Sequence, residues 1–67
     1  MEIIVNQNKM SVAEETSVQT LIDQLLGEKQ KGIAVAIGEH IVARSNWPTS
    51  KLKEKDTITI ITATQGG

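Results

Sequence analysis

The strongest constraint on the fold is the close of the chain, where a β-branched segment runs directly into two glycines. Residues 57–62 are all threonine or isoleucine, and Ile58 and Ile60 alternate with threonines at the two-residue period of a pleated strand. This pattern predicts a strand with one buried face. Gly66 and Gly67 have no Cβ, so they have nothing to pack and cost the most conformational entropy to order.

We therefore expect residues 65–67 to form a flexible Gly-Gly tail that becomes ordered only in a partner. Thr64, Gln65, Gly66 and Gly67 reach about 13–14 Å when extended, enough to thread a narrow channel. The Gly67 carboxylate would then lie in the active site of another protein as the reacting group. A disordered terminus without function could have the same sequence, so the hypothesis needs support from the rest of the chain.

Composition limits the other functions. The 67 residues suffice for one domain, and nine Ile, five Val and four Leu supply its core, with Trp47 as the sole aromatic residue. The absence of cysteine excludes disulfides, thiolate metal sites and a thiol nucleophile. Seven basic against eight acidic side chains argue against a nucleic-acid partner, and no apolar run approaches the roughly 18 residues of a membrane span. We expect a cytoplasmic protein without a membrane partner.

The first half of the chain predicts a hairpin and a helix. Residues 1–5 place Met1, Ile3 and Val5 on one face of a strand, and residues 6–9 form a turn in which two asparagines tolerate positive φ. A capping box at Thr16 and Gln19 predicts the start of an amphipathic helix of about ten residues. Its core-facing stripe is expected to comprise Val18, Leu21, Ile22, Leu25 and Leu26.

The second half predicts three further strands. Residues 33–37 alternate large and small apolar side chains, residues 38–40 turn the chain, and residues 41–44 return. Regularity then fails from 45 to 56, where we expect Trp47 and Leu52 to plug one end of the core.

The element order is thus strand, strand, helix, strand, strand, irregular segment, strand, all within one domain spanning residues 1–67. This order predicts a two-layer α+β fold in which the last strand pairs in parallel with the first, and both hairpins lie outside. The result is a β-grasp, ubiquitin-like arrangement with a mixed sheet of about five strands and one helix packed across one face.

The whole chain resembles the ThiS-type sulfur carriers, the ubiquitin-like proteins that carry sulfur for the thiazole ring of thiamine. The resemblance covers the opening hairpin, the helix, the strand at 33–37, the segment from Ile41 to Trp47, and the close from Ile60 to Gly67. One departure is visible. The family has Gly before the Asp that precedes the last strand, whereas this chain has Lys55, so a positive-φ turn there costs about 1–2 kcal/mol or a different turn is used.

The resemblance implies a co-substrate rather than an enzyme. An E1-like adenylating enzyme would use ATP to activate the Gly67 carboxylate, a persulfide donor would supply sulfur, and a thiazole synthase would consume the resulting thiocarboxylate. Thr64, Gln65 and Gly66 would be the tail that these partners recognise. The chain itself would bind no cofactor or metal, and it would supply no catalytic residue.

Three alternatives stay open at this point. A molybdopterin-type sulfur carrier would share the tail and the adenylation but serve another acceptor. A ubiquitin-like modifier would end in an amide to lysine through Gly67. A non-covalent β-grasp interaction module would have an inert tail. The single imidazole, His40, lies in a predicted turn and receives no role.

Overall fold

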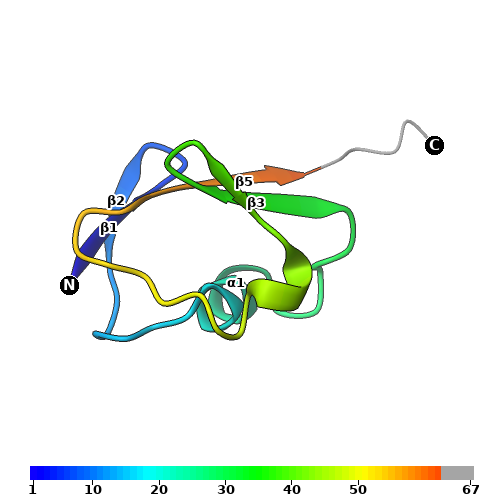
Figure 1. The fold of residues 1–67 in the computed structure, drawn as a ribbon, viewed down its shortest axis with the longest axis horizontal. Coiled ribbons are helices and arrows are strands. Elements are labelled where there is room, and N and C mark those ends of the chain that lie inside the picture. The colour runs from blue at the N-terminus through cyan, green and yellow to red at the C-terminus, as the bar shows by residue number, and fades with distance from the viewer. Residues whose placement is uncertain (63–67) are drawn as a thin grey trace.

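Strand β5 (Thr57–Thr62) lies at the centre of a five-stranded sheet in the computed structural model, which describes residues 1–62 (Figure 1). The strand order is β2-β1-β5-β3-β4. β5 runs parallel to β1 and antiparallel to β3, while the pairs β1/β2 and β3/β4 are antiparallel hairpins. The other four strands are β1 (Glu2–Val5), β2 (Asn8–Ser11), β3 (Ile33–Ile37) and β4 (His40–Val42).

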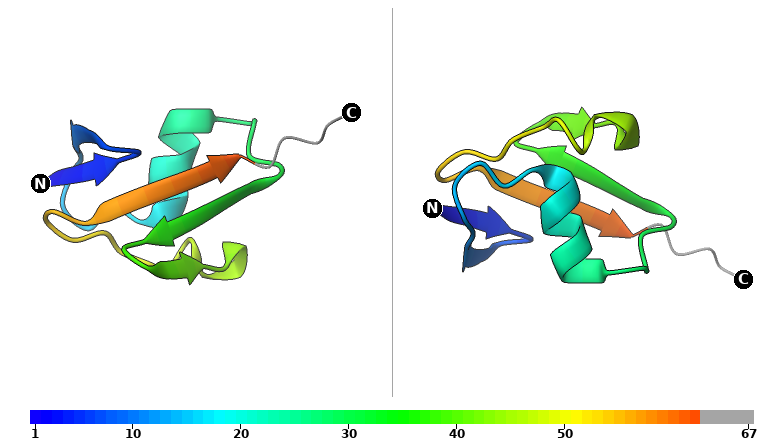
Figure 2. Two further views of the ribbon diagram at one scale, coloured as in Figure 1. Left: turned by 90° about the horizontal axis from the view of Figure 1, so that it is seen from above. Right: turned by 90° about the horizontal axis from the view of Figure 1, so that it is seen from below.

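Helix α1 (Val18–Leu26) covers one face of this sheet (Figure 2). Seen from above, the strands lie in front of the helix, and no other described element lies over them. The two short strands β2 and β4 form the sheet edges. The predicted β-grasp fold, its parallel first and last strands and its single covering helix are therefore confirmed.

The core forms where the helix meets the alternate residues of the sheet. Its main members have no exposed surface: Ile3, Val18, Leu21, Ile22, Val35 and Ile58. Trp47 and Leu52 are also buried and belong to the core, as expected. The indole of Trp47 donates a hydrogen bond from Nε1 to the Val42 carbonyl at 3.0 Å, so its polar edge is satisfied where its ring is buried.

The helix begins one residue later than predicted. Ser17, not Thr16, is the N-cap, and its hydroxyl accepts a hydrogen bond from the Thr20 backbone N–H at 3.1 Å. The Thr16 hydroxyl instead donates to the Ala13 carbonyl at 2.6 Å. Tertiary contacts select this register, because the Val18 N–H donates to the Ser50 carbonyl at 2.8 Å. The capping box at Thr16 and Gln19 is thus wrong.

The predicted apolar stripe of the helix is also too long. Val18, Leu21 and Ile22 are buried and Leu26 is half-buried, but Leu25 remains 40% exposed. Leu25 lies in the last turn of α1, close to Gly27, where the backbone takes φ +58° and ends the helix. The sheet does not extend far enough over this turn to cover it.

Three turns use positive φ without glycine: the β1/β2 hairpin, the turn at Glu15 (φ 64°) before α1, and the turn before β5. The β1/β2 hairpin reverses through Asn6 (φ 49°) and Gln7 (φ 73°), the two-residue geometry that matches the twist of the strands. Asn8 is already the first residue of β2, so Gln7, not a second asparagine, takes the second strained position. The turn before β5 keeps its positive φ at Lys55 (φ 67°), which resolves the choice left open by the sequence.

We predict that Leu21→Ala lowers the free energy of unfolding by about 2–5 kcal/mol, because it opens a cavity at a side chain with no exposed surface. Leu25→Ala, four residues along the same helix, should cost less than half as much because that side chain is partly in water. Urea unfolding of the two variants measures both values. Equal losses would mean that Leu25 is as deeply buried as Leu21.

We predict that Lys55→Gly raises the free energy of unfolding by about 0.5–1 kcal/mol. Removing Cβ relieves the left-handed strain at φ 67°, and the added chain entropy of the unfolded state offsets part of that gain. Lys53→Gly is the control, since Lys53 does not have positive φ and should lose stability. If Lys55→Gly lowered the free energy of unfolding as much as Lys53→Gly, the backbone at Lys55 would not be strained.

Candidate functional site

The candidate site is built on the carboxyl end of β5. This strand is the last described element and the central strand of the sheet, so Thr62 ends a strand that has neighbours on both sides. The predicted site residues Thr64, Gln65, Gly66 and Gly67 lie outside the described residues. The structure therefore describes the strand that leads to them and the surfaces beside it.

Hydrogen bonds hold β5 on both of its edges. Toward β1, the Ile4 N–H donates to the Asp56 carbonyl and the Asn6 N–H donates to the Ile58 carbonyl, each at 2.9 Å. Toward β3, the pairing runs along the strand from Ile58 to Thr62. Thr62 therefore ends a strand that pairs with β3 over most of its length. The side chain of Ile58, in the same strand, is fully buried.

An apolar surface lies on the sheet face away from the helix, next to the end of β5. Ile61 is 52% exposed and Ile41 is 68% exposed, and both are cross-strand neighbours of small residues in β3. We call this surface the open-face patch and define it by Ala34, Ile41, Thr59 and Ile61, with the buried Ala36 between them. It carries no charged side chain and includes the residue directly before Thr62. An exposed apolar surface of this kind is suited to contact with the apolar surface of a partner.

The sequence interpretation did not predict this patch, although the sequence itself indicates it. Ile60 and Ile61 are adjacent, and so are Ile41 and Val42. Because successive strand residues point to opposite faces, one member of each pair must lie on the face away from the core. Two such pairs in neighbouring parts of one sheet predict an apolar outer face.

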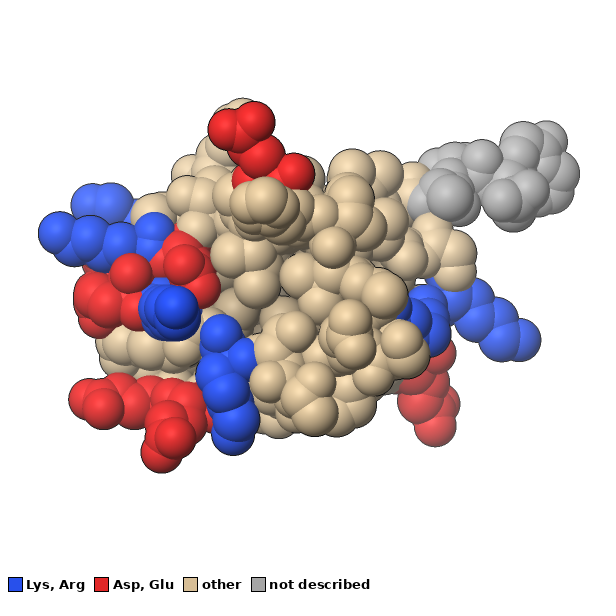
Figure 3. All heavy atoms as spheres, in the orientation of Figure 1, with Lys and Arg blue, Asp and Glu red and all other residues tan. Residues whose placement is uncertain are grey.

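Charged side chains concentrate away from the candidate site. On the face shown in Figure 3, most of them lie at the end of the molecule opposite the C-terminus, some acidic side chains lie at the top above the middle, and a smaller group lies below the C-terminal end. The area between these groups is uncharged. The segment before β5 contributes Lys53, Glu54 and Lys55, and the Glu54 carboxylate accepts a hydrogen bond from the Glu2 N–H at 3.2 Å. The charges near the start of β5 therefore lie at the opposite end of the strand from Thr62.

The described residues supply no metal cluster. Within residues 1–62, no three His, Asp or Glu side chains lie together in a way that could hold a metal ion. His40 is exposed at the start of the edge strand β4. Within residues 1–62, no helix has the length and apolar character needed to cross a membrane.

The sheet order, the single crossing helix and the central last strand define a ubiquitin-like β-grasp domain. The model of the ThiS family matches residues 1–67, and the chain belongs to this family. The predicted resemblance is therefore confirmed over the whole chain.

The relatives agree with this assignment. The chain is 33% identical over 67 residues to the sulfur carrier protein ThiS of Escherichia coli (strain K12), covering all of both chains. Its fold is similar to the crystal structure of the thiamine biosynthesis protein ThiS from Geobacter metallireducens, with a TM-score of 0.85 at 22% identity over the full length of both chains. An NMR solution structure of a thiamine biosynthesis protein from the same organism gives a TM-score of 0.79 at 22% identity, covering all of this chain and 88% of that one.

Proposed function

We propose that this protein is the sulfur carrier of thiazole synthesis and that its reacting group is the Gly67 carboxylate. The observation that carries the proposal is the family match over all 67 residues, which includes the terminal glycines. The fold supports it, because the last described residue before the tail ends a strand fixed at the centre of the sheet. Because the strand end is fixed in the sheet, a partner that binds the domain can position the residues that follow it.

The proposed cycle begins with activation. A carboxylate is a poor electrophile, so an E1-like enzyme would join the Gly67 carboxylate to the α-phosphate of ATP and release pyrophosphate. A persulfide of a sulfur donor would then attack the carbonyl carbon of the acyl adenylate, and AMP would leave. Cleavage of the sulfur–sulfur bond by a further thiol would free the Gly67 thiocarboxylate, whose sulfur a thiazole synthase would consume.

In this cycle the chain is a co-substrate, and its own contribution is steric and positional. The absence of Cβ at Gly66 and Gly67 leaves the carbonyl carbon open to attack and lets a narrow channel close around the backbone. Thr64 and Gln65 would be read by the partners along that channel. The open-face patch would give the partner a broad surface directly beside the strand that feeds the tail.

We predict that deleting Gly67, or replacing it with Ala, abolishes thiocarboxylate formation while the free energy of unfolding changes by less than about 0.5 kcal/mol. The readouts are intact-mass detection of the thiocarboxylate with the adenylating partner, ATP and a persulfide source, and urea unfolding of each variant. Leu21→Ala is the matched control, because a core variant should lose stability. A protein without Gly67 that still receives sulfur would refute the proposal.

We predict that the double variant Ile41→Thr/Ile61→Thr reduces the kcat/KM of thiocarboxylate formation by about tenfold, since it removes two apolar side chains from the open-face patch. Threonine keeps the β-branched shape that a strand favours, so the fold should be retained. Thr57→Ala, on the same face at the far end of β5, is the control and should leave the rate unchanged. An unchanged rate in the double variant would exclude this face as the docking surface.

A further inference from the structure

On the edge of β5 that faces β1, residues 59–62 have no described strand beside them. β1 pairs with β5 only at Thr57 and Ile58, because the chain turns away at Asn6 and Gln7. Backbone groups of alternate strand residues point to the same edge, so the Ile60 carbonyl and the Thr62 N–H point to the edge that faces β1. Among the described residues, no strand pairs with this part of the edge.

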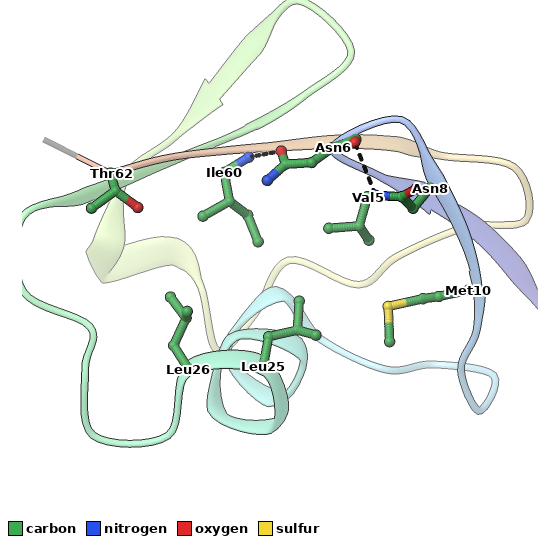
Figure 4. Close-up of a pocket in the computed structure, with 8 residues that line it drawn as sticks. All are labelled: Val5, Asn6, Asn8, Met10, Leu25, Leu26, Ile60 and Thr62. Carbon is green, nitrogen blue, oxygen red and sulfur yellow. Dashed lines mark hydrogen bonds between the residues drawn. The ribbon is translucent and has the colours of Figure 1, made fainter.

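A groove lies directly beneath this unpaired edge, on the helix side of the sheet (Figure 4). Its volume is about 350 Å³, and it is lined by Val5, Asn6, Asn8, Met10, Leu25, Leu26, Ile60 and Thr62. No lining residue is charged. Leu25, the helix residue that the sheet leaves 40% exposed, forms part of its wall.

The side chain of Asn6 satisfies the first N–H group of this edge. Its Oδ1 accepts a hydrogen bond from the Ile60 N–H at 2.8 Å, which fixes the orientation of the amide. Nδ2 then points toward the groove, as Figure 4 shows. The Ile60 carbonyl and the Thr62 N–H point to the edge as an acceptor and a donor, which is the alternation that an added strand requires, while the Asn6 amide offers a donor to the groove.

We propose that this edge and groove bind an extended segment of a partner protein, which adds a strand beside residues 60–62 and inserts an apolar side chain into the groove. Backbone hydrogen bonds to Ile60 and Thr62 would hold the segment, and the uncharged wall around Leu25 would select a side chain such as leucine. The occupant is an uncharged peptide strand because every lining group is apolar or an uncharged hydrogen-bonding group. The proposal concerns the helix side of β5 and does not depend on the chemistry proposed for Gly67.

The test uses the full chain labelled with ¹⁵N and a synthetic peptide in which leucine alternates with threonine, with a lysine at each end for solubility. Titration should shift the amide signals of Val5, Leu25, Leu26, Ile60 and Thr62, and it should slow hydrogen exchange at the Thr62 amide. Two further peptides carry N-methyl groups, one on its leucine nitrogens and the other on its threonine nitrogens. Only one edge of the added strand pairs with β5, so one methylation pattern should abolish binding and the other should retain it.

Two matched variants separate the groove from the other exposed apolar surface. Leu25→Gln should weaken peptide binding by about tenfold, because it removes an apolar wall without opening the core. Ile41→Gln, on the opposite face of the sheet, should leave the affinity unchanged. Both side chains are partly in water, so both variants should fold, which their ¹H–¹⁵N spectra will verify.

Several results would overturn the proposal. These are the absence of any shift at millimolar peptide, shifts confined to the open-face patch, or equal binding of both methylated peptides. Concentration-dependent shifts at Leu25 and Thr62 without peptide would instead identify a second copy of the chain as the occupant. Shifts at Val5 and Leu25 on deletion of residues 63–67 would identify the chain's own tail.

Discussion

The pairing of β5 between β1 and β3 is the interaction on which the rest of the structure depends. It joins residues far apart in the chain, since Ile4 pairs with Thr57 and Val5 with Ile58. Without β5, the two hairpins would be separate ribbons and the helix would have no continuous surface to cover. Ile58, in the middle of this arrangement, has no exposed surface. The strand that precedes the tail is thus also the strand that closes the core.

This constraint gives β5 different surfaces on its two sides. Ile58 and Ile60 face the helix, whereas Thr57, Thr59 and Ile61 face the uncovered side of the sheet. The open-face patch lies on one side of the strand end, and the groove beside Leu25 lies on the other. Since most of the charged side chains lie at the far end of the molecule, both surfaces beside Thr62 are suited to apolar contact with a partner (Figure 3).

Much of the fold followed from local patterns in the sequence. The two-residue alternation at 33–37 and 57–62 and the helical spacing from Val18 to Ile22 predicted three elements whose buried faces the structure confirms. Errors arose where tertiary contacts decide. The 50–52 segment bonds to the residues before the helix and moves the N-cap to Ser17, and the limited extent of the sheet leaves Leu25 exposed.

The site was only partly predictable. Gly66 and Gly67 were predicted from their lack of Cβ, and Thr64 and Gln65 from the reach of the tail and the family resemblance; all four lie outside the described residues. The open-face patch was not predicted because the alternation of Ile58 and Ile60 identifies only the core face of β5, whereas the exposure of Ile61 depends on the absence of a covering element on the other face. The unpaired edge of β5 depends on where β1 turns away, at Asn6 and Gln7, and this is a property of the register between two distant segments.

The central claim is that the folded domain presents Gly67 as an acceptor of sulfur. The most direct measurement is tandem mass spectrometry of the intact chain after incubation with ATP, a persulfide source and the adenylating partner. We expect a mass gain equal to the replacement of one oxygen by one sulfur, located at Gly67 by fragmentation. An unchanged mass, or a larger adduct joined through an amide to a lysine of another protein, would contradict it.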